Sequence, residues 1–271
     1  MGVFSEKEPG YFTLTPLAAC LQSDIPGSMR SLVIMVGEKH YQAWGDILYS
    51  LRTGDSAFEH IYGMPLFQYY AQNSAQGKIF DEAMTNNSST ENFEIATSYD
   101  FSGIHKLVDV GGGQGSLIAS ILKANPKMQG VLFDLPTVIA GALDLIEAEG
   151  ISNRCSLVAG DFLDSVPSGG DGYILKRVIH NGEDERARAI LKNCHRAMVE
   201  HGKLLVLEQV IPLGNEPFFG KFLDLMMMVM FPGACERTEA EYRALFEASG
   251  FQLTRIYPTR TGISVIEGIR V

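Results

Sequence analysis

The chain has 271 residues, of which 46% are hydrophobic and 20% are charged, and this composition excludes a disordered or fibrous protein. Asp and Glu outnumber Lys and Arg by 32 to 22, which gives a formal net charge of −10. Such a surface repels nucleic-acid phosphates and anionic lipid headgroups, so we expect neither nucleic acid nor a membrane as a partner.

The first hundred residues have the apolar spacing of helices and few strand patterns. Residues 28–51 predict a long helix, because apolar side chains recur there every three or four residues and Gly54 follows as a stop. Two further helices are expected, one after Pro65 and one through Phe80 and Met84. The polar run 86–90 predicts a loop or a cap before the next helix.

From residue 106 onward, short apolar strands alternate with helices. Strands are expected at 106–110, 129–133, 155–159, 172–176 and 203–208, and helices at 116–123, 137–149 and 184–198. This alternation predicts a parallel sheet that is covered by helices on both faces. The tail, at 251–257 and 262–269, predicts two strands with no helix between them, and hence an antiparallel pair at the edge of the sheet.

The cysteines and the apolar runs indicate the compartment. Cys20, Cys155, Cys194 and Cys235 are far apart and form no CxxC pair, which predicts neither a metal site nor a disulfide framework. No apolar run approaches the ~18 residues of a membrane span, and the polar start lacks the apolar core of a signal peptide. We therefore expect a cytoplasmic protein without a bound metal.

A glycine-rich loop joins the first strand of the sheet to a helix. With so few Cβ atoms, this loop lets a ligand approach both the backbone and the N-terminus of the helix, although a tight turn needed only for packing would look similar. A dinucleotide fingerprint needs Gly at the first, third and sixth positions, and here the sixth position is Ser116. The pattern acid-x-Gly-x-Gly-x-Gly fits instead, at Asp109, Gly111, Gly113 and Gly115.

Acidic residues also end the next two strands. Asp134, about 20 residues beyond the loop, can accept both hydroxyls of a ribose, or it can cap the helix that begins at Pro136. Asp161 can bind an adenine amino group and Phe162 can stack on the base. Alone, the triplet Gly160-Asp161-Phe162 would be an ordinary turn. Because the three strand ends meet at one edge of the sheet, together they predict a nucleotide-type ligand.

Nearly the whole chain resembles the S-adenosylmethionine (SAM)-dependent O-methyltransferases, a family that includes plant caffeic acid O-methyltransferase and bacterial natural-product enzymes. The resemblance is carried by segments 107–115, 133–136, 160–162, 174–180, 204–208 and 236–238. It implies an α/β, Rossmann-like methyltransferase fold at 101–271, mostly parallel with a C-terminal antiparallel strand. It also implies SAM as the cofactor, with contacts at Gly111, Gly113, Asp134, Leu135, Asp161, Phe162 and Lys176.

The resemblance further implies a catalytic base at His180, supported by Glu208 and Glu236. The chemistry agrees, because a phenol with a pKa near ~10 is a poor nucleophile until it loses its proton, and a carboxylate beside an imidazole can fix its tautomer. Each residue also has an ordinary interpretation. His180 could be a solvated histidine and Glu208 a surface acid, while Glu236 could be a helix-start acid near a capping box at 238–241.

The acceptor pocket is expected to be apolar. The methionine-rich stretch 222–231 offers flexible walls for a flat aromatic ring, although each methionine could equally belong to the core. The resemblance implies that Met227 and Phe231 face the acceptor, together with Phe80 and Met84 of the helical segment. Residues 1–100 would then be a lid plus the remnant of another domain, and the substrate would be a small aromatic molecule.

Two departures from the family pattern stand out. After His180 the family has an acid or Asn and then Trp, whereas here Asn181 is followed by Gly182, which removes one wall of the adenine pocket. Residues 10–17 resemble the last wing strand of the winged-helix dimerisation domain, and nearly all of that domain is missing. The family forms homodimers, so we expect a weaker or absent dimer here if that domain is truly missing.

The leading hypothesis is methyl transfer to a hydroxyl of a phenolic acceptor. One alternative is a SAM-binding protein that catalyses a rearrangement or a hydroxylation, and another is a catalytically silent binding protein. The presence of the histidine and both glutamates favours the first hypothesis. An NAD-dependent oxidoreductase is disfavoured by the glycine spacing, and nucleic-acid methylation by the charge and by the lack of an Asn-Pro-Pro-Tyr type motif.

Overall fold

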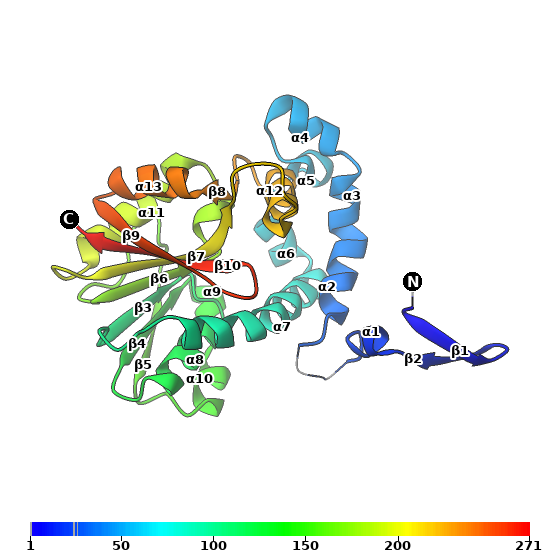
Figure 1. Ribbon diagram of the computed structural model, residues 1–271, viewed down its shortest axis with the longest axis horizontal. Coiled ribbons are helices and arrows are strands. Elements are labelled where there is room, and N and C mark those ends of the chain that lie inside the picture. The colour runs from blue at the N-terminus through cyan, green and yellow to red at the C-terminus, as the bar shows by residue number, and fades with distance from the viewer. Residues whose placement is uncertain (1, 24, 26) are drawn as a thin grey trace.

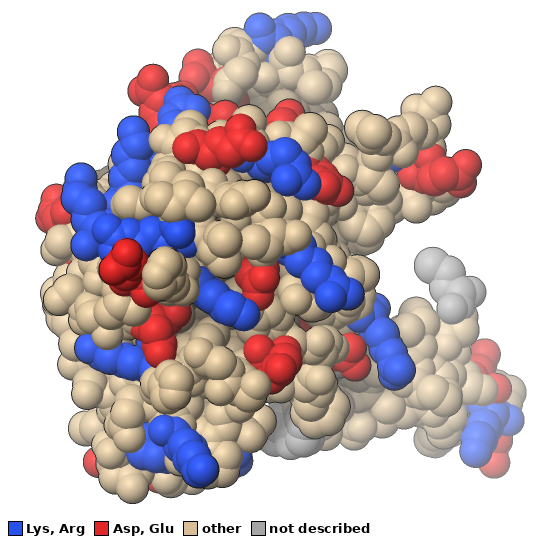
Figure 2. All heavy atoms as spheres, turned by 60° about the vertical axis from the view of Figure 1, so that its left-hand side comes forward, with Lys and Arg blue, Asp and Glu red and all other residues tan. Residues whose placement is uncertain are grey.

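A twisted sheet with helices on both faces forms one half of the molecule, and a group of helices forms the other half (Figure 1). The computed structural model describes residues 2–23, 25 and 27–271, without the side chains of residues 87, 89 and 90. No helix within these described residues is long and apolar enough to cross a bilayer. Acidic and basic side chains are interspersed on the face shown in Figure 2.

The main sheet has the strand order β5-β4-β3-β6-β7-β10-β9. Its parallel strands are β3 (Lys106–Val110), β4 (Gln129–Asp134), β5 (Cys155–Ala159), β6 (Gly172–Lys176) and β7 (Lys203–Ile211). The strand β10 (Ile263–Arg270) pairs antiparallel with both β7 and β9 (Phe251–Pro258), while the short β8 (Arg237–Thr238) pairs parallel with β7. The predicted mostly parallel sheet with an antiparallel edge is therefore confirmed.

The direction in which the chain adds strands reverses between β3 and β6. From β3 the chain proceeds outward to β4 and β5, and it then returns to place β6 on the other side of β3. Open sheets of this kind bind ligands outside the carboxyl ends of the strands at such a reversal. The loops that follow β3 and β6 meet there.

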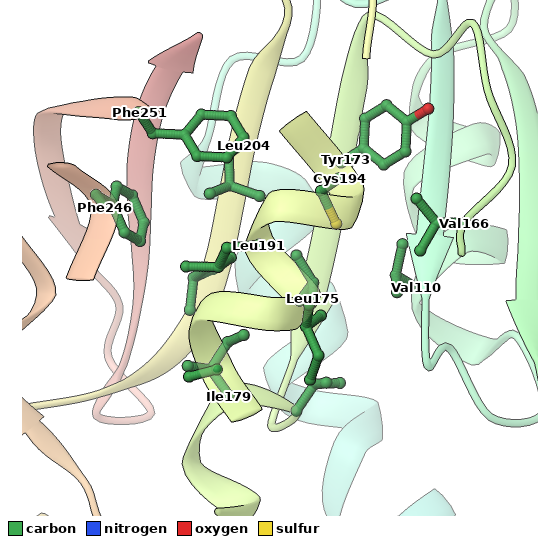
Figure 3. Packing of buried hydrophobic residues seen from close by; sticks show 14 of the residues in the cluster. Val110, Val166, Tyr173, Leu175, Ile179, Leu191, Cys194, Leu204, Phe246 and Phe251 are labelled. Carbon is green, nitrogen blue, oxygen red and sulfur yellow. The ribbon is translucent and has the colours of Figure 1, made fainter. Parts of the chain in front are cut away.

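Helices cover both faces of the sheet because the strands carry apolar side chains on both faces. One face packs against α8 (Ser116–Ala124), α9 (Pro136–Ile139) and α10 (Leu143–Ala148). The other face packs against α11 (Asp184–Ala197) and α13 (Glu239–Glu247). Figure 3 shows Leu191 and Cys194 of α11 among Leu175 of β6, Leu204 of β7 and Phe246 of α13.

The helical half contains most of the first hundred residues together with one later helix. Its elements are α2 (Arg30–Met35), the π-helix η1 (Val36–His40), α3 (Tyr41–Trp44), α4 (Ile47–Thr53), α5 (Ala57–Tyr62), α6 (Leu66–Gln72), α7 (Ser74–Ser98) and α12 (Phe219–Met230). Buried side chains of α3, α5 and α6 pack on Val229 and Met230 of α12. The long α7 lies between these helices and the sheet (Figure 1).

Three predicted elements differ from the structure. The loop expected at 86–90 is wrong, because α7 continues through it and is packed between α2 and α8. The helix expected at 28–51 is interrupted at Gly45 and Asp46. A hydrogen bond of 2.8 Å joins the Asp46 carboxylate to His60 Nδ1 at this point. The helix expected at 137–149 is divided into α9 and α10 near Gly141, whose backbone packs against the Gln114 side chain.

The N-terminal segment forms an exposed antiparallel ribbon, β1 (Phe4–Glu8) and β2 (Tyr11–Leu14), followed by α1 (Pro16–Ala19). It projects from the helical half in Figure 1. A strand within 10–17 is thus present. Its derivation from a wing of a missing domain stays a prediction.

Candidate active site

The glycine loop after β3 is held tightly against the sheet on one side and is open on the other. The backbone at Gly111 and Gly113 has φ of 71° and 60°, which favours glycine. A Cβ at Gly112 would lie 2.4 Å from Leu132 Cδ1 and 2.6 Å from Asp109 Cγ, whereas a Cβ at Gly113 would meet no atom within 4 Å. The loop therefore presents bare backbone at the carboxyl edge of the sheet.

Asp134 joins the ends of β3 and β4. Its Oδ2 accepts a hydrogen bond of 2.8 Å from the backbone N–H of Gly113, and its Oδ1 accepts one of 2.7 Å from that of Leu135. Burial raises the pKa of this carboxyl, while the two N–H donors act against that rise. The structure thus places three predicted cofactor residues within one hydrogen-bonded unit.

Phe162 lies over the start of the glycine loop. A Cβ at Gly111 would be 3.4 Å from Cε1 of this half-buried ring. The Arg186 guanidinium lies 5.6 Å from the centre of the same ring. In addition, a Cβ at Gly182 would lie 2.6 Å from Arg186 Cδ. The arginine therefore extends from the position where the family pattern has Trp to the ring of Phe162.

Asp161 is placed at the same edge by its own backbone turn. Its Oδ1 accepts a hydrogen bond of 2.8 Å from the backbone N–H of Leu163. The Asn193 side chain, from α11, donates a hydrogen bond of 2.8 Å to the carbonyl oxygen of Phe162. Helix α11 thus fixes the segment that carries Asp161 and Phe162.

The amine of Lys176 is paired with side chains of the long helix α7. Lys176 Nζ lies 2.9 Å from Glu91 Oε2 and donates a hydrogen bond of 2.8 Å to Asn92 Oδ1. The Asn92 side chain also donates to Ser116 Oγ, 2.9 Å away at the start of α8. Burial lowers the pKa of Lys176, and the nearby Glu91 carboxylate acts in the opposite direction. A predicted cofactor residue is therefore already paired within the protein.

Sequence reasoning missed Glu91 and Asn92. Both are buried, yet they follow directly on a polar run that predicts a loop, and a polar pattern gives no sign that a helix is packed on both sides. Their position can be found only from the tertiary contacts of α7.

His180 and Glu236 form a buried pair. His180 Nδ1 lies 2.6 Å from Glu236 Oε1, and the two side chains are 6% and 0% exposed. His180 lies in the short helix η2 (Ile179–Asn181), directly after β6, and Glu236 directly precedes β8. A carboxylate at Nδ1 fixes the ring orientation and leaves Nε2 as the nitrogen that can accept a proton.

Glu208 supports the histidine through the backbone. Its Oε1 accepts hydrogen bonds from the backbone N–H groups of Ile179, at 2.7 Å, and His180, at 3.0 Å. Its Oε2 accepts a hydrogen bond of 2.7 Å from the hydroxyl of Tyr242, and burial raises the pKa of the carboxyl. Glu208 thus holds the segment that carries the imidazole, whereas Glu236 contacts the ring itself.

Two further residues, which sequence reasoning missed, hold the segment that carries Glu236. Asp224 accepts a hydrogen bond of 2.8 Å from the Glu236 backbone N–H. Arg237 lies 2.8 Å from Asp184 and donates to the carbonyl oxygen of Ile179 at 3.2 Å. Asp224 could have been found, because it is the single acid within the apolar stretch 222–231.

His180 lines a small hollow between the sheet edge and α12. The hollow is lined by Arg177, His180, Glu208, Gln209, Leu223, Glu236 and Ile263. Leu223 belongs to a buried cluster that contains Met227 and contacts Phe231. Phe67 connects the ring of Phe231, at 5.4 Å, to that of Phe80, at 6.0 Å. Met84 is half-buried one helical turn beyond Phe80.

The residues at this edge fit SAM. An adenosyl group needs a strand-end acid for its ribose and a ring for its base, and Asp134 and Phe162 meet at a loop whose Gly113 backbone faces open space. A doubly wound sheet with this loop, followed by a buried histidine–glutamate pair, defines a Rossmann-like SAM-dependent methyltransferase.

Comparisons with known proteins identify the family. Residues 43–252 match the family model of the O-methyltransferase domain. A phenazine O-methyltransferase from Lysobacter antibioticus is 46% identical over 98% of this chain and 78% of its own length. A 3-amino-4-hydroxybenzoate 4-O-methyltransferase from Streptomyces cremeus is 39% identical over 94% of this chain and 70% of its own length. The chain belongs to the O-methyltransferase family, with SAM as its methyl donor.

Solved structures agree. The crystal structure of LaPhzM has a TM-score of 0.94 and 45% identity, over 100% of this chain and 81% of that one. The O-methyltransferase NcsB1 of neocarzinostatin biosynthesis, in complex with SAM and 2-hydroxy-5-methyl naphthoic acid, has a TM-score of 0.87 and 29% identity over the same shares. The α/β methyltransferase fold is thus confirmed.

Proposed function

We propose that this enzyme methylates a hydroxyl of a small aromatic secondary metabolite, with His180 as the general base. The observation that carries the proposal is the buried contact of 2.6 Å between His180 Nδ1 and Glu236 Oε1. No described residue forms a hydrogen bond with His180 Nε2, and the ring lines the hollow. This nitrogen is therefore the one that faces an acceptor.

The proton of the acceptor hydroxyl moves to His180 Nε2 as the oxygen becomes nucleophilic. When bound, SAM supplies a methyl group on a positively charged sulfur. The Glu236 carboxylate, at Nδ1, stabilises the imidazolium that results, and Glu208 keeps the backbone of Ile179 and His180 in place. A positioned general base contributes about 10²–10⁴-fold to a rate. The proton then passes from His180 to solvent.

We assign the cofactor to the glycine loop and the neighbouring strand ends. The backbone at Gly111 and Gly113 would border it, Asp134 and Leu135 would hold its ribose, and Asp161 and Phe162 its adenine. These roles rest on the positions of the residues at one edge of the sheet. Lys176 would contact the cofactor while its amine stays paired with Glu91.

We assign the acceptor to the space between α7 and α12. Phe80 and Phe231 belong to one aromatic cluster, and Met227 packs beside Leu223 of the hollow. The hollow is too small in this structure to hold an aromatic ring. We therefore infer that residues 1–100 include a lid, with α7 moving relative to α12 when the acceptor enters, and that 101–271 form the catalytic domain.

The named relatives support the class of acceptor. Their names specify a phenazine, an aminohydroxybenzoate and a naphthoic acid, all of which are flat aromatic molecules. Such a ring suits walls built from phenylalanine and methionine, which are apolar and polarizable.

The proposal is tested by incubating the enzyme with methyl-labelled SAM and a panel of hydroxylated phenazines, benzoates and naphthoates, followed by mass spectrometry. We expect at least one hydroxylated ring to gain a labelled methyl group, with one equivalent of S-adenosylhomocysteine (SAH) formed. The matched O-methylated ring serves as the control and should gain none. SAM binding with no transfer to any hydroxyl in the panel would contradict the proposal.

A further inference from the structure

Glu91 is a buried acid of helix α7 that faces two cations of the sheet edge. Its side chain is 8% exposed, with Oε2 2.9 Å from Lys176 Nζ and Oε1 in contact with Arg177 Nη2. Burial opposes ionisation of Glu91, but the charges of Arg177 and Lys176 outweigh it and hold the pKa below its ordinary value. Glu91 is therefore a carboxylate at neutral pH.

The Glu91 carboxylate balances part of the positive charge of Lys176 and Arg177. In the corner formed by these three residues, both cations face Glu91. The other acids near them are Asp109, whose pKa burial raises to about 7, and Glu208 and Glu236, which line the same hollow as Arg177. Lys176 is held further by the neutral side chain of Asn92. Removal of the Glu91 charge would leave two cations at the edge of the sheet where the glycine loop ends β3.

The backbone at Arg177 is strained. Arg177 has φ of 56°, a left-handed conformation that non-glycine residues rarely adopt. Its backbone N–H donates to Leu207 at 3.1 Å, and its carbonyl oxygen accepts a bond of 2.8 Å from Asn181. The guanidinium of Arg177, which lies three residues before His180, contacts Glu91.

Charge distinguishes the two forms of the cofactor. SAM carries a sulfonium cation, whereas the product SAH has a neutral thioether at the same atom. A buried positive charge near the sulfur therefore opposes SAM much more than SAH, because charges interact strongly where water is scarce.

We propose that Glu91 is the counter-charge that allows this site to accept a cationic cofactor beside Lys176 and Arg177, and that it thereby sets the preference for SAM over SAH. This inference rests on the SAM site proposed above. Glu91 acts through the field of the corner and needs no contact with the cofactor, so it is a positioning residue.

The test is calorimetric titration of SAM and of SAH into the wild-type protein and the Glu91→Gln variant. Gln has nearly the same shape but no charge. We expect the SAM dissociation constant to rise about tenfold and that of SAH less than twofold. The matched control is Glu94→Gln, which removes a half-buried acid of α7 that forms no ion pair with a described residue, and which should change neither constant.

Two further variants separate charge from structure. Glu91→Gln combined with Arg177→Gln restores the net charge of the corner and should restore the ratio of the two constants. Glu91→Asp keeps the charge and should keep the ratio of the two constants, even if both affinities fall. This variant also tests the proposal if Glu91→Gln does not fold. Equal losses for SAM and SAH in Glu91→Gln, or no loss, would overturn the inference. A wild-type protein that binds neither ligand would instead overturn the SAM site.

Discussion

His180 Nδ1 and Glu236 Oε1 lie 2.6 Å apart, between side chains that are 6% and 0% exposed. The two residues come from different loops at the carboxyl edge of the sheet, one after β6 and one before β8. A carboxylate hydrogen-bonded at Nδ1 fixes the orientation of the ring. The pair thus fixes the imidazole of the proposed general base in one orientation.

Replacement of Glu236 by Gln tests the electrostatic part of this pair. The amide keeps the shape of the side chain but removes the charge, so we expect kcat to fall about 100-fold, with the SAM dissociation constant within about twofold of wild type. Steady-state kinetics and calorimetry provide the two numbers. Glu239→Gln, which affects an exposed ion pair with Arg243, is the control. A kcat within threefold of wild type would show that the charge has no part in catalysis.

Asp109 predicts a specific pH dependence of stability. Burial raises its pKa from 3.8 to about 7 in the folded protein, so the folded state holds this proton more tightly than the unfolded chain. The resulting stabilisation is complete below pH 4 and is lost as the pH rises through 7. We expect Asp109→Asn to gain about 2–3 kcal/mol relative to wild type between pH 5 and pH 8, measured by urea unfolding of both proteins. A pH-independent difference would place the carboxyl's pKa near its ordinary value.

Two alanine substitutions in the glycine loop should have different effects. Gly112→Ala places a Cβ 2.4 Å from Leu132 and 2.6 Å from Asp109, and we expect a loss of about 1–3 kcal/mol in the free energy of unfolding. Gly113→Ala meets no atom within 4 Å but has φ of 60°, so the strain is about 1 kcal/mol. Its methyl group would enter the proposed SAM site.

Unfolding curves and SAM titrations of both variants separate these effects. We expect Gly113→Ala to lose at least about tenfold in SAM affinity while it remains the more stable of the two proteins. SAM affinity equal to that of wild type in Gly113→Ala would show that the cofactor does not lie along this part of the loop.

Phe231 tests the acceptor site. Its ring lies 5.4 Å from that of Phe67 and packs against the cluster of Leu223 and Met227. For Phe231→Ala, with the acceptor found in the panel, we expect KM for the acceptor to rise about tenfold and SAM affinity to stay constant, because only the aromatic wall is lost. Phe93→Ala, at a residue that is 67% exposed on α7, controls for the loss of an aromatic side chain. An unchanged acceptor KM would place the ring outside the pocket.

The sheet could be predicted from the sequence because each strand is a short apolar run that ends at a turn residue. The same pattern placed Asp134, Asp161 and Lys176 at one edge, and the capping box at Thr238 and Glu241 is confirmed. The prediction of a loop at 86–90 was wrong because the polarity of a segment does not show which helices pack against it. Helix α7 is stabilised by its packing on α2 and α8, and not by an apolar stripe of its own.

The contacts within the site could not be predicted because they join segments far apart in the chain. The family resemblance implied that Glu208 and Glu236 both support His180, but only the structure distinguishes the carboxylate that contacts the ring from the one that binds the backbone. In the same way, Lys176 is recognisable as a strand-end cation, but its partner Glu91 comes from a helix that the polar run concealed.

The measurement that tests the account most directly is methyl transfer by His180→Gln, with the labelled-SAM assay and the best acceptor of the panel. We predict a fall in turnover of about 10²–10⁴-fold, with the SAM dissociation constant within about twofold of wild type, because the variant loses the base and keeps the cofactor site. Turnover within threefold of wild type would contradict the assignment of His180 as the general base.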